Sequence, residues 1–126
     1  EMLKEIGLDP LIKTTGKTGL HLYVPVLRHY PYFVVRKACE TIGHYVSAAM
    51  PGKLTLDWAV PKRTGKVFFD YNQNVRGKTL AAAYSLRPAP LATVSVPIEW
   101  DELATVYPWA RIMEHKHDLR PLLEGV

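Results

Sequence analysis

The sequence has 126 residues, of which 48% are hydrophobic and 22% charged, a composition that excludes a disordered tail and predicts one compact domain over residues 1–126. Lysine and arginine number 16 against 12 acidic residues, which permits an anionic partner, although many basic proteins bind no nucleic acid. The single cysteine excludes an internal disulfide, and no long apolar run is present, so we expect a cytoplasmic protein with no membrane partner.

The chain begins with a pattern typical of a helix end. Glu1–Ile6 has helical character and is followed by Gly7, a residue type that commonly ends helices. No capping residue precedes this segment. We therefore expect part of the protein to lie upstream of Glu1.

A β-hairpin is predicted next. Leu8–Thr14 is extended in character and is interrupted by Pro10, which suits a strand entered through a turn. Thr14–Gly19 contains two glycines and three threonines, and Leu20–Val26 alternates and is rich in strand-forming residues. The polar tip of the hairpin is expected at Gly16, Lys17 and Thr18.

The middle of the sequence predicts a long helix and two short strands. Apolar residues recur at steps of three and four over residues 31–50, which gives one apolar helical stripe, and Pro51 ends the helix. The short strands are expected on either side of the basic pair Lys62–Arg63. They comprise Leu54–Leu56 and Lys66–Tyr71.

The last third is less regular. Thr79–Tyr84 is ambiguous, and the prolines at positions 88, 90 and 97 predict an irregular crossing segment. Glu99–Val106 is expected to form a short helix with acidic residues at its positive end, and a charged tail follows. Together these elements predict an α+β fold with an antiparallel or mixed sheet and flanking helices.

The glycine-containing turn is the first candidate site. Gly16 and Gly19 would let backbone amides approach an anion closely, and Lys17 or Thr18 adds a further donor, which suits a triphosphate. The turn is not a P-loop, because it leads into a strand and lacks the P-loop spacing. The alternative is a purely structural turn, since turns need glycine for backbone reasons.

Asp70 is the second candidate. It follows the apolar residues Val67–Phe69, so its carboxylate is expected at the surface or edge of a sheet, where Mg²⁺ or Mn²⁺ would find the oxygen ligand that it prefers. One carboxylate is too few for a two-metal nucleotidyl-transfer site. The alternative role for Asp70 is that of a turn-capping residue.

Basic residues bracket this aspartate. Arginine offers a planar fork for phosphate, so a cluster of cations around an acid matches an anionic substrate with a metal. The set comprises Arg63, Lys66, Arg76, Lys78 and Arg87. A solvated basic surface is the alternative. His21 lies on a predicted strand, where a lone histidine is more often a hydrogen-bonded core residue than a catalyst.

Three blocks of the sequence, taken in order, resemble the polymerase module of bacterial and archaeal DNA ligase D, which belongs to the archaeo-eukaryotic primase superfamily. The blocks are Lys13–Pro25, Arg63–Asn74 and Tyr84–Arg87. The resemblance implies a template-directed nucleotidyltransferase that fills or extends DNA ends in non-homologous end joining, using NTP or dNTP with Mn²⁺ or Mg²⁺. It also implies a nucleoid-associated location, a Ku-like end-binding partner and a DNA ligase module.

The resemblance also implies roles for individual residues. Asp70 matches the third metal-binding aspartate of the family and therefore a catalytic position. Thr15 stands where the family usually has serine, and Gly16–Gly19 reads Gly-Lys-Thr-Gly in place of the frequent Gly-Gly-Lys-Gly, so the task of the triphosphate lysine is shifted or passes to Thr18. The implied nucleotide-binding set is Thr15, Gly16, Lys17, Thr18, His21, Arg63, Gln73 and Arg87.

One motif of the family is absent from the sequence. It is the Asp-x-Asp pair that supplies most of the metal ligands. We therefore interpret the chain as the C-terminal part of the module and expect it not to catalyse alone, with Asp70 and the hairpin tip meeting in space. Two alternatives stay open: a non-catalytic nucleic-acid-binding module, and an α+β scaffold whose resemblance is architectural only.

Overall fold

The computed structural model of the protein describes residues 1–105 and 117–118, which form two compact units. The first unit comprises Glu1, Leu3–Pro25 and the described residues from Leu80 onward, and the second comprises Met2 and Val26–Thr79. Most of the predicted charged tail lies outside the described residues. The expectation of a single domain over residues 1–126 stays a prediction.

The first helix, α1 (Met2–Glu5), ends as the sequence predicts. Gly7 has φ +79°, a left-handed conformation that glycine adopts without strain. The Gly7 N–H donates to the Lys4 carbonyl at 3.0 Å, and the Leu8 N–H donates to the Leu3 carbonyl at 2.9 Å. These bonds satisfy carbonyls that a helix end otherwise leaves unpaired.

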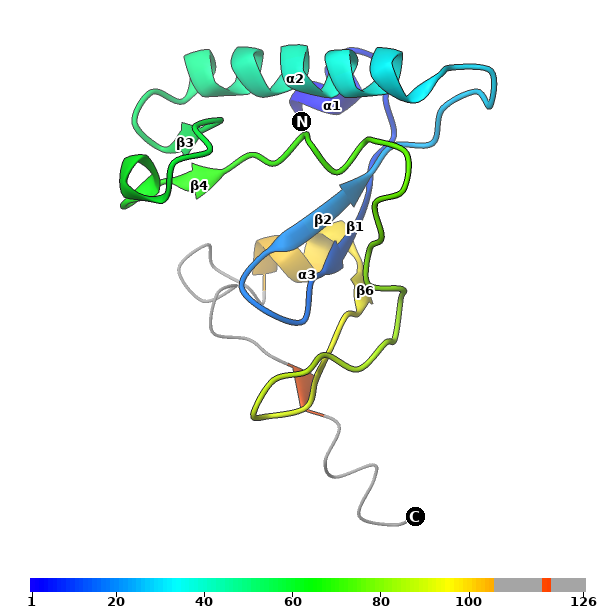
Figure 1. Ribbon diagram of the computed structural model, residues 1–126, viewed down its shortest axis with the longest axis vertical. Coiled ribbons are helices and arrows are strands. Elements are labelled where there is room, and N and C mark those ends of the chain that lie inside the picture. Colours follow the sequence, from blue (N-terminus) through cyan, green and yellow to red (C-terminus); the bar gives the residue numbers. More distant parts are fainter. Residues whose placement is uncertain (106–116, 119–126) are drawn as a thin grey trace. The chain divides into compact units, whose positions relative to one another are not determined.

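The first unit is built on a three-stranded antiparallel sheet, in the order β2-β1-β6 (Figure 1). The predicted hairpin is confirmed: β1 (Leu11–Thr14) pairs with β2 (Leu20–Tyr23), which is shorter than expected. The third strand, β6 (Pro97–Ile98), lies in the segment predicted to be irregular. Proline is tolerated there because β6 is at the sheet edge, at the start of a strand.

Two further elements complete the described part of the first unit. The short strand β5 (Thr93–Val94) pairs with β7 (His117–Asp118), and α3 (Trp100–Thr105) confirms the predicted helix as far as it is described. The indole N–H of Trp100 donates to the Pro10 carbonyl at 2.9 Å, which ties the start of α3 to the chain before β1.

The best-buried residues of the first unit lie where β1 meets the segment around β5. Ile12 and Val94 are 4% and 1% exposed, while Thr93 and Ser95 are fully buried. This core is partly polar, and its hydroxyls are hydrogen-bonded to the hairpin, as buried polar groups require. The hairpin is therefore fixed to the rest of its unit by specific bonds as well as by apolar contact.

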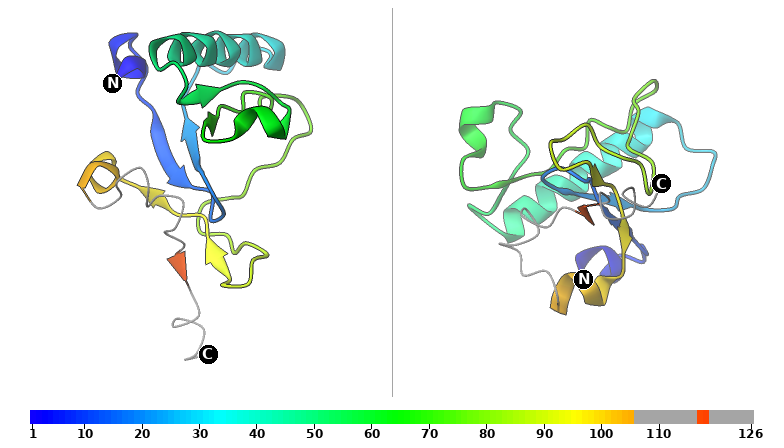
Figure 2. Two further views of the ribbon diagram at one scale, coloured as in Figure 1. Left: turned by 90° about the vertical axis from the view of Figure 1, so that its left-hand side faces the viewer. Right: turned by 90° about the horizontal axis from the view of Figure 1, so that it is seen from below.

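The second unit packs one long helix against a pair of parallel strands. The helix α2 (Tyr32–Ala49) confirms the prediction to within a residue at each end. It lies along β3 (Leu54–Thr55) and β4 (Val67–Phe68), which are joined through the 3₁₀ helix η1 (Val60–Arg63) (Figure 2). The unit therefore places the residues after β4, Asp70 among them, beside α2.

Only part of the predicted apolar stripe of α2 is covered within the structure that is described. Gly43 is the buried residue of the helix. A Cβ at this position would lie 2.8 Å from Phe69 Cδ1 and 2.9 Å from Leu56 Cδ2, so the missing side chain allows α2 to approach the strands closely. Val34 and Tyr45, on the same predicted stripe, are exposed. No helix among the described residues has the length and apolar character needed to cross a bilayer.

Candidate nucleotide-binding site

The turn between β1 and β2 is organised by Thr15. Its hydroxyl oxygen accepts hydrogen bonds from the N–H groups of Lys17 (3.1 Å) and Gly19 (3.2 Å). Its own N–H donates to the Gly19 carbonyl at 2.9 Å, which closes the turn. Two amides that the sequence offered to an anion are therefore used inside the turn. The Thr15 hydroxyl hydrogen stays available as a donor, because the oxygen acts as the acceptor in both bonds.

Gly16 is required at its position by both conformation and space. Its φ is +70°, and a Cβ there would lie 2.8 Å from the Val94 carbonyl carbon and 2.6 Å from Arg87 Cγ. The Gly16 carbonyl accepts a hydrogen bond from the Thr93 hydroxyl. Lys17 and Thr18 are exposed at the tip. The turn is thus held rigidly at its base, while its charged tip is open to solvent.

Lys13 and His21 stand on one face of the sheet, because they are direct partners in the β1–β2 register. Tyr23 shares this face by the alternation of the strand; its ring lies 6.1 Å from that of His21 and 5.8 Å from Lys13 Nζ. Nδ1 of His21 is buried and has no hydrogen-bond partner among the described residues. This face therefore presents an unsatisfied imidazole nitrogen beside a cation.

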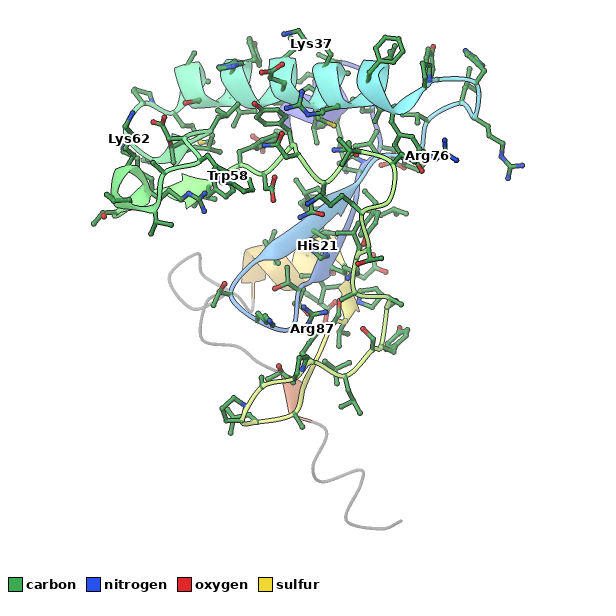
Figure 3. The ribbon with its side chains drawn as sticks, viewed as in Figure 1. His21, Lys37, Trp58, Lys62, Arg76 and Arg87 are labelled. Atoms are coloured by element: carbon green, nitrogen blue, oxygen red, sulfur yellow. The ribbon has the colours of Figure 1, made fainter. Side chains whose placement is uncertain are left out.

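Arg87 adds a second cation to this face. Its side chain runs past Gly16, and its Nε is buried without a hydrogen-bond partner in the part of the chain that is described. Figure 3 shows His21 on β2 and Arg87 on the segment beside the hairpin. Buried polar groups are normally paired. Two unpaired buried nitrogens on one face therefore mark a place suited to a ligand.

The charges of this face act on one another. Burial, and then the nearby charges of Lys13 and Arg87, hold the pKa of His21 below its ordinary value. Burial, and then Arg87, lower the pKa of Lys13 in the same way. These groups therefore repel one another in the free protein, and an anion would relieve that repulsion. We call Lys13, His21 and Arg87 the basic face.

Asp70 lies in the second unit, in the turn after β4. The Asn72 N–H donates to its Oδ1 at 2.9 Å, and Gln73 Nε2 donates to its Oδ2 at 3.4 Å. Asp70 is exposed, so its carboxylate keeps lone pairs that face solvent. Oε1 of Gln73 is buried and lacks a hydrogen-bond partner in the described structure. Asp70 thus caps its own turn, and it can also offer one oxygen ligand to a cation.

Arg63 is engaged by its own unit. Its guanidinium lies 3.6 Å from the centroid of the Phe68 ring and 5.4 Å from that of Trp58. Its Nε donates to the Asp57 carbonyl at 3.0 Å, and Nη2 donates to the Trp58 carbonyl. These contacts fix the loop between β3 and β4. The other three guanidinium N–H groups have no hydrogen-bond partner among the described residues, so they could meet a phosphate.

The comparison with protein families decides what the chain is related to. The family model described as LigD, primase-polymerase domain, matches residues 1–120. The chain belongs to this family.

Relatives of this LigD primase-polymerase chain span several bacteria. The multifunctional non-homologous end joining protein LigD of Pseudomonas aeruginosa is 36% identical over 102 residues, which cover 81% of this chain and 12% of that protein. The protein of the same description from Mycolicibacterium smegmatis is 35% identical, over 82% of this chain and 14% of that protein. The bifunctional non-homologous end joining protein LigD of Bacillus subtilis is 31% identical, over 81% of this chain and 17% of that protein.

A solved structure shares the fold of this chain. It is the polymerase domain from Mycobacterium tuberculosis Ligase D in complex with DNA, with a TM-score of 0.83 and 31% sequence identity. The match covers 98% of this chain and 41% of that chain. The likeness confirms the predicted α+β fold. Together with the family match, it sets aside the alternative in which the resemblance is architectural only.

The predicted site residues of this chain are divided between its two compact units. The first unit brings together the turn residues, His21 and Arg87, while Asp70, Gln73 and Arg63 belong to the second unit. The expected meeting of Asp70 with the hairpin tip involves both units and stays a prediction. Within residues 1–105 and 117–118, no three histidine, cysteine, aspartate or glutamate side chains are grouped as a metal site would require.

Sequence reasoning missed Lys13 as a member of the basic face. The signal was available in the hairpin itself: with the tip centred on Lys17, positions 13 and 21 are equidistant from it and therefore face each other across the strands. It also missed Arg36, which binds the loop after Asp70. No local pattern could have indicated that contact, because it joins a helix to a distant loop.

Proposed function

We propose that this chain forms part of a template-directed nucleotidyltransferase that fills or extends DNA ends in non-homologous end joining. The observation that carries the proposal is that two buried nitrogens of the basic face, His21 Nδ1 and Arg87 Nε, have no hydrogen-bond partner in the described part of the chain. They occur in a chain of the LigD primase-polymerase family. The relatives named above are end-joining proteins, and the solved relative is complexed with DNA.

The basic face and the turn would bind the triphosphate of an incoming NTP or dNTP. Arg87 offers a guanidinium donor and His21 an imidazole nitrogen, and both nitrogens lose their unpaired state when a phosphate oxygen accepts from them. The Thr15 hydroxyl and the exposed Lys17 and Thr18 side chains would add contacts at the tip. Repulsion among the cations of the basic face falls when the anion enters, which favours binding.

Asp70 would supply one ligand to a divalent cation. A bound Mg²⁺ or Mn²⁺ neutralises phosphate charge and activates the attacking hydroxyl of a primer. The residues present fit this role only in part, because Asp70 offers one carboxylate and the chemistry needs several. We propose that the other carboxylates lie outside residues 1–126. Catalysis would then need the longer protein, whereas nucleotide contacts would already be present in this chain.

Gln73 and Arg63 would support the same reaction from the second unit. Gln73 Nε2 steadies the Asp70 carboxylate, and its unpaired Oε1 would accept a hydrogen bond from the nucleotide. Arg63, already stacked on Phe68, would present its remaining N–H donors to phosphate. DNA ends in primer-template form, a Ku-like protein and a ligase module are the partners that this function would require.

The test is Mn²⁺-dependent nucleotide addition to a primer-template by the full-length protein. We expect Asp70→Asn, which keeps shape and removes charge, to lower the rate by about a hundredfold or more. Asp57→Asn is the matched control, because Asp57 is an exposed carboxylate of the same unit paired with Lys62 at 3.7 Å. Full activity of Asp70→Asn would overturn the metal role. Salt-dependent DNA binding without nucleotide addition by the wild type would favour the non-catalytic binding module.

A further inference from the structure

Lys13 is a buried cation in the middle strand of the sheet. It is only 5% exposed. Its Nζ donates to the Ala81 carbonyl at 2.7 Å and to the Ser95 hydroxyl, which is fully buried and in turn donates to the Thr14 carbonyl at 2.7 Å. A side chain with this many fixed partners holds its ammonium group in one place.

The ammonium group has no counterion in the structure that is described. Lys37 pairs with Glu40 and Lys62 with Asp57, and no ion pair between described residues involves Lys13. Its neighbours are instead a second cation, Arg87, and the imidazole of His21 directly across the strand pair. Burying a charge without an opposite charge is costly, and the nearby charge of Arg87 adds repulsion to that cost.

Such an arrangement is unfavourable in the free protein and favourable once an anion is present. An ammonium group has three N–H donors, and the two bonds named above use two of them. Among the described residues the third has no partner, and His21 Nδ1 and Arg87 Nε on the same face are likewise unpaired, which leaves all three for a ligand. The charge of Lys13, its third donor and the unpaired nitrogens of the basic face would all be satisfied by an anionic ligand.

We propose that Lys13 is a positioning residue of the nucleotide site, whose fixed buried charge draws the triphosphate onto the basic face between His21 and Arg87. This inference rests on the proposed function, because it takes the anion to be the triphosphate of the nucleotide. It assigns this task to a residue of the sheet interior, in addition to the contacts proposed for the exposed Lys17 at the tip. Lys17 is exposed at the tip, whereas the ammonium group of Lys13 is held in place by Ala81 and Ser95.

The experiment measures binding of inorganic tripolyphosphate to the protein by calorimetry. We expect Lys13→Met to weaken binding by about tenfold or more, as the loss of a charged hydrogen-bonding partner implies. Lys13→Gln, which keeps donor groups and removes the charge, should weaken it to a similar degree, while Lys13→Arg should restore most of the affinity. Urea unfolding of each variant shows whether the fold is intact.

The outcomes separate this inference from the proposed function. If folded Lys13→Met and Lys13→Gln bind tripolyphosphate like the wild type while His21→Ala and Arg87→Ala do not, the role of Lys13 is overturned and the site stands. Absence of binding by the wild type would overturn both. If neither neutral variant folds, the ¹⁵N resonance of the Lys13 ammonium in the wild type decides: it should shift on adding tripolyphosphate, and an unchanged resonance would refute the inference.

Discussion

Arg36 of α2 holds Asn72, two residues beyond Asp70, by two hydrogen bonds from Nε (3.2 Å) and Nη2 (2.6 Å) to Asn72 Oδ1. The guanidinium also lies 5.0 Å from the centroid of the Tyr71 ring. Because the Asn72 N–H donates to Asp70, a helix side chain fixes the turn that carries the candidate metal ligand. The position of Asp70 thus depends on α2.

Replacing this arginine should loosen the turn. Arg36→Met removes both bonds and leaves the Asn72 oxygen without its charged donor, so we expect the free energy of unfolding to fall by about 1–3 kcal/mol. Arg36→Lys should lower the free energy of unfolding by a smaller amount, because lysine keeps the charge but cannot reproduce the planar fork of two donors. Urea unfolding measures both changes. Lys37→Met is the control: Lys37 is exposed on the same helix and forms a surface ion pair with Glu40, so little change is expected.

The contact between Arg36 and Asn72 illustrates what sequence alone could not show. The hairpin, α1 and α2 were predicted correctly because their signals are local: periodic apolar residues, prolines at helix ends, and glycine where φ is positive. The strand expected over Lys66–Tyr71 is shorter, since β4 ends at Phe68, and Asp70 takes the turn-capping role that was the alternative. Each of these elements is fixed by residues close together in the chain.

The parts that were missed are fixed by residues far apart in the chain. The strand β6 forms because Pro97 and Ile98 pair with the edge of β1 that β2 leaves open. The sequence did not indicate this strand, because Pro97 is one of its residues and proline is uncommon in strands. The buried state of Lys13 depends on Ala81 and Ser95, so no pattern around residue 13 could have shown it. Motifs predicted which residues would bind the nucleotide. That Lys13 is a buried cation close to Arg87 could be seen only from the structure.

Gly16 offers a test of how tightly the hairpin turn is built. Gly16→Ala forces a Cβ into a left-handed backbone and within 2.8 Å of Val94, so we expect a loss of more than about 2 kcal/mol in the free energy of unfolding. Gly7→Ala is the matched control in the same unit. Gly7 has φ +79° with open space around it, so it should lose only the conformational part, about 1–2 kcal/mol. Equal losses would show that Val94 does not crowd the turn.

The basic face also makes stability depend on pH. The pKa of folded His21 lies below its ordinary value of 6.5, so near and below that pH the unfolded chain binds a proton that the folded chain resists. The free energy of unfolding therefore rises with pH. The stability that depends on a neutral His21 is fully present above about pH 6.5, the unfolded value, and is lost as the pH falls toward the folded pKa. The groups facing His21 are Lys13, Tyr23 and Arg87. Urea midpoints from about pH 7 to 5 should therefore fall less steeply in His21→Asn than in the wild type, whereas the exposed His44→Asn should keep the wild-type slope. An unchanged slope in His21→Asn would contradict the depressed pKa.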